Sequence, residues 1–143
     1  MCGMDGCYME ISKDVFRISK DIERSKSLIA MAKERVNEVI PLYPKEIAYK
    51  ILEEYYEVAV QLMTSIMYAD GFKTLSHIKL IEYVGNCEGI GESEVKILDS
   101  MRKFRHGTFY YGKKESGNFF LNHEEEIKEI IEKLMKIAEG KGC

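Results

Sequence analysis

Basic and aromatic side chains gather in one short segment of the chain. They are Arg102, Lys103, Arg105, His106, Tyr110, Tyr111, Lys113 and Lys114. Five of these residues are fixed cations, whereas the whole chain has a formal net charge of -3. Arginine pairs with phosphate, histidine titrates near neutral pH and tyrosine can stack on a base. The segment therefore predicts a site for an anionic partner, although a basic run at a helix C-terminus can also simply complement the helix dipole and face solvent.

Length and composition are those of one helix-rich globular domain. The chain has 143 residues, of which 45% are hydrophobic and 31% charged, with only two prolines. We expect a single domain over residues 1–143, with its core over about residues 11–138. The longest uncharged apolar stretch, residues 58–69, is far shorter than the roughly 20 residues that span a bilayer. The N-terminus does not have the order of a signal peptide, so we expect a cytoplasmic protein.

Four cysteines are too few for a small domain held together by disulfides, and we expect reduced thiols. Cys2 and Cys7 could form one half of a metal site. A zinc ion needs two more ligands, which the neighbouring sequence does not clearly supply. We therefore predict no metal and no cofactor.

The helices that must position the basic segment can be placed from their apolar spacing. A first long helix carries an apolar stripe that begins at Val15 and Ile18 and should end near Ile40, because Pro41 and Pro44 interrupt it. A second helix should begin at Pro44 and end at Asp70. Its wide apolar face makes it the candidate central helix. This face comprises Ile47, Ile51, Leu52, Tyr55, Tyr56, Ala59, Leu62, Met63, Ile66 and Met67.

The remaining helices follow the same pattern. The third has a stripe of Leu75, Ile78, Ile81 and Val84, and the fourth has one of Val95, Leu98, Met101 and Arg105. Because Arg105 continues an apolar stripe, we expect it at the exposed end of the bundle or in a groove with a partner for its charge.

Residues 107–121 contain three glycines and predict a loop that could order around a ligand. The spacing of Asn122 and Glu125 is that of a capping box, so the final helix should begin there. No segment has a strand pattern that competes with these helix assignments. The fold class predicted from these elements is all-α, an antiparallel bundle of about five helices.

Most catalytic motifs are absent from the sequence: it has no phosphate-binding glycine loop, no paired-histidine zinc helix and no glycine-flanked serine. Three histidines remain to be weighed. We expect His123 on the surface of the last helix and His77 in a capping or packing role. His106, beside Arg105, is the candidate for function.

Two segments together resemble the HEPN domains, small helical bundles of prokaryotic defence and toxin–antitoxin systems. The first runs from Tyr55-Tyr56 to Asp70-Gly71 and on to Thr74-Leu75-Ser76-His77. The second is Arg105-His106 followed by Tyr110-Tyr111. The resemblance covers about residues 11–138 and implies a homodimer. In active members of the family, an arginine, a polar residue and a histidine four to six positions after the arginine cleave RNA without a metal.

This chain departs from that pattern. Arg105 and His106 match the arginine and its polar neighbour, but the window where the histidine should lie holds no histidine and contains Tyr110 and Tyr111 instead. Tyrosine titrates too high to be an easy base. The resemblance also implies that some members partner a nucleotidyltransferase that modifies a tyrosine near this motif, for which Tyr110 and Tyr111 are the candidates here.

Three functional hypotheses follow. The favoured one is a dimeric HEPN-like module of a toxin–antitoxin system that binds RNA or a nucleotide without cutting it. Its predicted binding residues are Arg102, Arg105, His106, Tyr110, Tyr111 and Lys113. The second is a metal-independent endoribonuclease toxin, in which Arg105 stabilises the scissile phosphate and His106 moves protons. The third is a helical scaffold whose basic loop docks an acidic protein.

Overall fold

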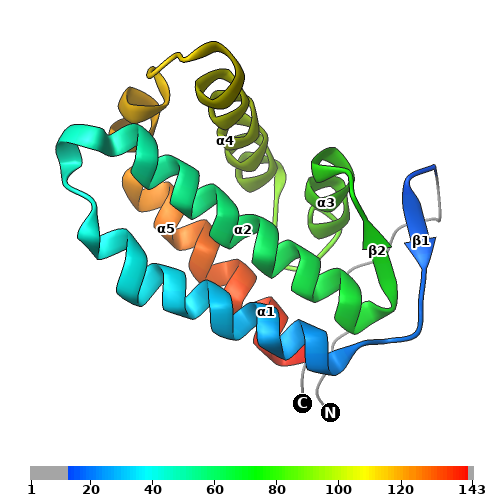
Figure 1. Cartoon of the computed structure of the whole chain (residues 1–143). Coiled ribbons are helices and arrows are strands. Elements are labelled where there is room, and N and C mark those ends of the chain that lie inside the picture. The colour runs from blue at the N-terminus through cyan, green and yellow to red at the C-terminus, as the bar shows by residue number, and fades with distance from the viewer. Residues whose placement is uncertain (1–12, 142–143) are drawn as a thin grey trace.

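A computed structural model describes residues 13–141 as five helices and two short strands (Figure 1). The helices are α1 (Ile22–Glu34), α2 (Ala48–Asp70), α3 (His77–Val84), α4 (Glu92–Tyr111) and α5 (Ser116–Lys141). The strands are β1 (Val15–Arg17) and β2 (Phe72–Thr74). The prediction of a bundle of about five helices is confirmed, and the strand pair is an addition to it.

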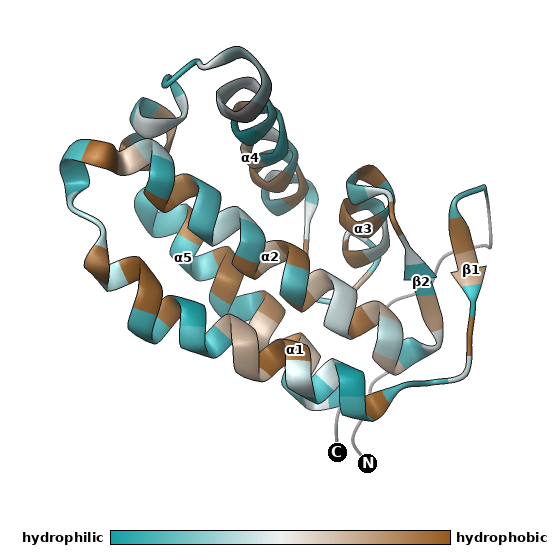
Figure 2. Cartoon of the chain, in the orientation of Figure 1, coloured by the Kyte–Doolittle hydropathy of each residue, from teal (hydrophilic) through white to brown (hydrophobic). Residues whose placement is uncertain are grey.

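Helix α2 is the centre of the bundle, as its sequence predicted. It packs mainly along α1 and α5, and it also contacts α3 and α4. Figure 2 shows polar and apolar residues alternating along α1 and α5, as expected for helices with one face in solvent. Nine of the ten residues of the predicted α2 face are buried, and Ile47 is the exception. The core of one chain buries nearly the whole face, so the width of this face is no evidence for a dimer.

The start of the chain differs from the prediction. Val15 lies in β1, where it pairs with Thr74 of β2 in an antiparallel register, and Ile18 donates a backbone hydrogen bond to Gly71 at 2.8 Å. The helix begins only after Asp21, whose carboxylate accepts from the Arg24 N–H at 3.0 Å. An aspartate at this position caps a helix and favours its start there. Residues 15–18 pair instead with residues 71–74, which are far away in the sequence. The spacing of apolar residues along the chain cannot reveal such a pairing.

Prolines shape the link between α1 and α2, as predicted. Helix α1 continues through a π-helical turn (Arg35–Val39) and a 3-10 turn (Ile40–Leu42) that contains Pro41. A second 3-10 turn (Lys45–Ile47) follows Pro44 and leads into α2. Such turns are common at helix ends because they accommodate a residue without an N–H.

The prediction for the third helix is partly wrong. Ile81 and Val84 are buried, but Leu75 is 97% exposed and Ile78 is 49% exposed. Leu75 precedes α3, which begins after Ser76, whose hydroxyl accepts from the Lys79 N–H at 3.2 Å. The helix therefore has only two turns. Its first turn extends beyond the core and lies beside α4 instead.

The segment predicted as a loop, residues 107–121, is mostly helical. Helix α4 continues to Tyr111 and ends at Gly112, which has a φ of +66° and donates its N–H to the Thr108 carbonyl at 3.2 Å. Only residues 112–115 form the connection to α5. The Thr108 hydroxyl lies 2.9 Å from that of Ser116, which is 1% exposed. This contact between the two helices holds their ends together despite the glycines.

Helix α5 also begins earlier than the capping box at Asn122 predicted. Its helical geometry breaks at His123, with φ of -127° and ψ of 17°, so the expected boundary appears as a kink. The turns before the kink are held by packing, because buried Phe120 stacks on Tyr55 of α2 at 5.6 Å between ring centres.

Cys87 is buried and disulfide-bonded, which corrects the expectation of a free thiol at this position. Cys2 and Cys7 lie outside the described residues.

Candidate nucleic-acid interface

Four of the six predicted binding residues line one pocket between α2, α3 and α4. The pocket has a volume of about 310 Å³. Its lining residues are Tyr56, Ser76, His77, Ile78, Arg102, Arg105, His106 and Tyr110. We call it the arginine pocket. The tertiary structure adds Tyr56 and the first turn of α3 to the predicted set, whereas Tyr111 and Lys113 lie outside this pocket.

The two arginines are half-buried and each has a carboxylate beside it. Arg105 lies 3.4 Å from Glu57, and its guanidinium carbon is 6.0 Å from the centre of the Tyr56 ring. Arg102 donates two hydrogen bonds to Asp99, at 3.0 and 2.9 Å. These contacts confirm that Arg105 lies in a groove and shares its charge. They orient both guanidinium groups in the wall of the pocket.

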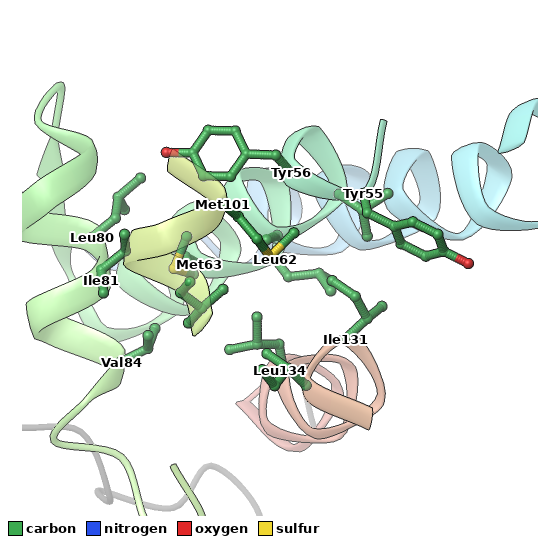
Figure 3. Close-up of a cluster of buried hydrophobic side chains, with 14 of the residues drawn as sticks. Tyr55, Tyr56, Leu62, Met63, Leu80, Ile81, Val84, Met101, Ile131 and Leu134 are labelled. Carbon is green, nitrogen blue, oxygen red and sulfur yellow. The ribbon is translucent and has the colours of Figure 1, made fainter. Parts of the chain in front are cut away.

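His77 also lines the arginine pocket, although its position in the sequence predicted only a capping or packing role. The Tyr56 hydroxyl and His77 Nδ1 are 2.8 Å apart. Figure 3 shows the rings of Tyr55 and Tyr56 pointing away from each other, so the neighbouring tyrosines contact two different parts of the bundle. The Ser76 cap, together with a hydrogen bond of 3.0 Å from its N–H to the Thr74 hydroxyl, fixes the start of α3 and with it His77. In the sequence, the helix-capping residue Ser76 directly before His77 was the signal that could have indicated a fixed position for this histidine.

Burial and the arginines keep His77 neutral. The pKa of His77 lies below its usual value, mainly because burial disfavours the imidazolium and also because Arg105 repels it. Burial raises the pKa of Tyr56 to about 12, so this phenol stays protonated at neutral pH. The pair therefore combines a neutral imidazole and a neutral hydroxyl in a pocket that is also lined by two guanidinium groups, each paired with a carboxylate.

The free energy of unfolding is expected to fall as the pH drops below about 6.5, the usual pKa of histidine. His77 has a lower pKa in the folded state than in the unfolded state. Between the two values the unfolded state binds more protons, so the contribution of His77 is fully present above about pH 6.5 and is lost as the pH falls through the folded pKa. Urea denaturation between about pH 5 and 8 should show a shallower decline for His77→Gln than for the wild type. Equal declines would contradict the assignment.

His106 lies at the rim of the arginine pocket, in contact with both predicted tyrosines. Its ring centre is 4.4 Å from that of Tyr110 and 5.9 Å from that of Tyr111. Neighbouring residues on a helix, such as Arg105 and His106, point about 100° apart around its axis. The pocket is wide enough for both residues to line it.

A second pocket lies on the other side of His106, with a volume of about 500 Å³. We call it the lysine pocket, because Lys103 and Lys113 line it together with Tyr111 and Glu115. The two predicted binding residues that are absent from the arginine pocket, Tyr111 and Lys113, are therefore found here. His106 is the residue that both pockets share.

His123 is half-buried rather than on the open surface, which corrects its predicted place. Its ring stacks on Phe119 with centres 4.4 Å apart, and Nδ1 lies 3.0 Å from the Phe119 carbonyl. These contacts give it a structural role at the kink of α5.

No group of three or more histidine, cysteine, aspartate or glutamate side chains within residues 13–141 is arranged to hold a metal ion. In the same part of the chain, no helix is both long and apolar enough to cross a membrane.

No protein-family model, curated protein or solved structure matches the sequence or the fold of this chain. The function is therefore argued from the two pockets themselves.

Proposed function

We propose that the protein is a HEPN-like module that binds single-stranded RNA or a nucleotide, with a phosphate group in the arginine pocket. The observation that carries this proposal is the convergence of Arg102 and Arg105 on one pocket whose rim holds His106 and Tyr110. Guanidinium groups bind phosphate oxygens through paired hydrogen bonds. Aromatic side chains beside such a site can stack on an unpaired base.

The electrostatics of the arginine pocket suit a bound anion. Glu57 and Asp99 hold the arginines by ion pairs that are partly open to solvent, with 38% and 36% of the carboxylate side chains exposed. Such ion pairs contribute little to stability, so a phosphate can share the guanidinium groups at small cost. The Tyr56 hydroxyl and His77 add neutral hydrogen-bonding groups to the same pocket.

Family resemblance adds a homodimer and a protein partner to the proposal. Leu75 and Ile78 are exposed apolar residues beside the arginine pocket, and contact with a second copy would cover them. Tyr110 and Tyr111 are 62% and 68% exposed, so both side chains lie on the surface that a modifying nucleotidyltransferase would approach.

RNA cleavage is the second candidate, and a specific observation favours it. His77 and His106 both line the arginine pocket, although neither occupies the position of the family histidine. A neutral imidazole can take a proton from a 2′-hydroxyl, and the arginines can stabilise the charge that develops on the phosphate. The lowered pKa of His77 keeps it in the form of a base at neutral pH.

One titration tests the binding proposal and separates it from cleavage. Fluorescently labelled single-stranded RNA is titrated with the protein in the presence of a chelator, and fluorescence anisotropy reports binding at several salt concentrations. We expect saturable binding that weakens with salt, with a log–log slope of about -1.4 if two phosphates are neutralised. Inorganic phosphate should compete. Binding that does not saturate, or that does not change with salt, would reject the proposal.

The RNA recovered from the same titration is then resolved on a denaturing gel. Intact RNA supports the binding module. Cleavage that disappears in both His77→Ala and His106→Ala supports the endoribonuclease instead, and cleavage that persists in both variants identifies a contaminating nuclease.

A further inference from the structure

The arginine and lysine pockets form one continuous surface over the last turns of α4. His106 lines both pockets, and its ring contacts Tyr110 on one side and Tyr111 on the other. Three exposed rings thus lie between two groups of cations. A site for a single phosphate would need only one of these groups.

The lysine pocket has the chemistry of a second phosphate site. The Lys103 side chain is 68% exposed, and its ammonium group lies 3.1 Å from Asp99 in an ion pair that water screens strongly. Lys113 lies in the short link after Gly112, where it lines the same pocket. Glu115 is the one carboxylate among the residues that line this pocket, and Asp99 lies behind Lys103 as its ion-pair partner.

Tyr111 completes this pocket as a surface for a base. It is 68% exposed at the end of α4, and its ring is roughly perpendicular to that of His106, with an angle of 63° between the planes. An exposed aromatic ring beside cations is the arrangement by which proteins hold successive bases of a single strand.

We infer that the ligand is a single-stranded RNA segment of at least two nucleotides, which crosses His106 with one phosphate in the arginine pocket and the next in the lysine pocket. This inference rests on the proposed function and narrows it, since a mononucleotide would fill only one of the two pockets. The strand must be single, because its bases have to leave a helix to reach the tyrosines.

Length dependence of binding tests this inference. The affinities of uridine monophosphate and of single-stranded RNAs of roughly two to six nucleotides are compared for the wild-type protein. We expect the longer RNAs to bind at least about tenfold more tightly than the mononucleotide, because they add phosphate and base contacts in the lysine pocket. Equal affinities for the mononucleotide and the longer RNAs would overturn the inference.

A lysine variant locates the source of the length dependence. In Lys103→Ala, Lys113→Ala, the ratio of oligonucleotide to mononucleotide affinity should fall to about one-tenth of its wild-type value. The matched control Lys26→Ala, Lys136→Ala removes the same charge from exposed positions outside both pockets and should keep the ratio. An unchanged ratio in the pocket variant, or equal competition by polyglutamate, would overturn the inference.

Further variants and controls separate this inference from the proposed function. If the Tyr111 ring stacks on a base, Tyr111→Phe should keep the ratio of oligonucleotide to mononucleotide affinity, because it keeps the ring. Tyr111→Leu removes the ring and should lower this ratio by about tenfold. Thermal unfolding followed by circular dichroism verifies that each variant is folded. A mononucleotide that binds in the arginine pocket without any gain from added length rejects the inference alone, whereas the absence of all nucleotide and RNA binding rejects the proposed function as well.

Discussion

An Arg102→Ala, Arg105→Ala double variant is expected to bind RNA at least about 100-fold more weakly than the wild-type protein. Each hydrogen bond from a charged group contributes about 1.5–3 kcal/mol, so loss of two such contacts costs about 3–6 kcal/mol. A factor of ten in affinity corresponds to about 1.4 kcal/mol. The two arginines lie three residues apart on α4 and line the same pocket, so no other guanidinium there replaces them.

The controls for this variant use the chain's own arginines. Arg17→Ala, Arg24→Ala removes the same charge from exposed positions in β1 and α1, outside both pockets, and should change the affinity by less than about threefold. Arg102→Lys, Arg105→Lys keeps the charge but loses the planar fork, and an intermediate affinity is expected. If the alanine double variant bound RNA as tightly as the arginine control, the phosphate site would not be in the arginine pocket.

Replacing Lys141 by alanine is expected to lower the free energy of unfolding by about 3–5 kcal/mol, the usual cost of removing one partner of a buried ion pair. The Lys141 ammonium lies 2.9 Å from Asp70 Oδ1 and 3.1 Å from Oδ2, and its side chain is only 4% exposed. Tyr83 donates to the same carboxylate at 2.5 Å. The pair therefore holds the last residue of α5 against the ends of α2 and α3.

Urea denaturation followed by circular dichroism measures this effect. Lys136→Ala, at an exposed position on the same helix, is the matched control and should change the free energy of unfolding by less than about 0.5 kcal/mol. A loss below about 1 kcal/mol in Lys141→Ala would show that the end of α5 is not held by this pair.

The positions of the helices could be predicted because their signals are local. Apolar residues at helical spacing marked the face of α2, and Gly71, with a φ of +91°, ends this helix where a glycine after Asp70 predicted it. The same reasoning predicted Arg105 either at the exposed end of the bundle or in a groove with a partner for its charge, and the structure has the second arrangement. Its partner, Glu57, lies on α2, 48 positions earlier in the chain.

The errors arose where distant segments decide local structure. β1 exists because β2 offers it a partner, and a three-residue strand has too short a pattern to detect. Residues 107–111 remain helical despite Gly107, since the Thr108 hydroxyl contacts Ser116 at the start of α5. Helix propensity costs only about 1 kcal/mol per glycine, which such contacts can offset.

The sequence by itself determined the helical fold class, the central place of α2 and the basic and aromatic segment at the end of α4. Each of these depends on the order and spacing of nearby residues. Only the tertiary structure decided that Tyr56 and His77 join Arg102 and Arg105 in one pocket and that His106 borders a second pocket. A helix period tells which face of a helix is buried but not which neighbour covers it, so the meeting of three helices at one pocket required their packing.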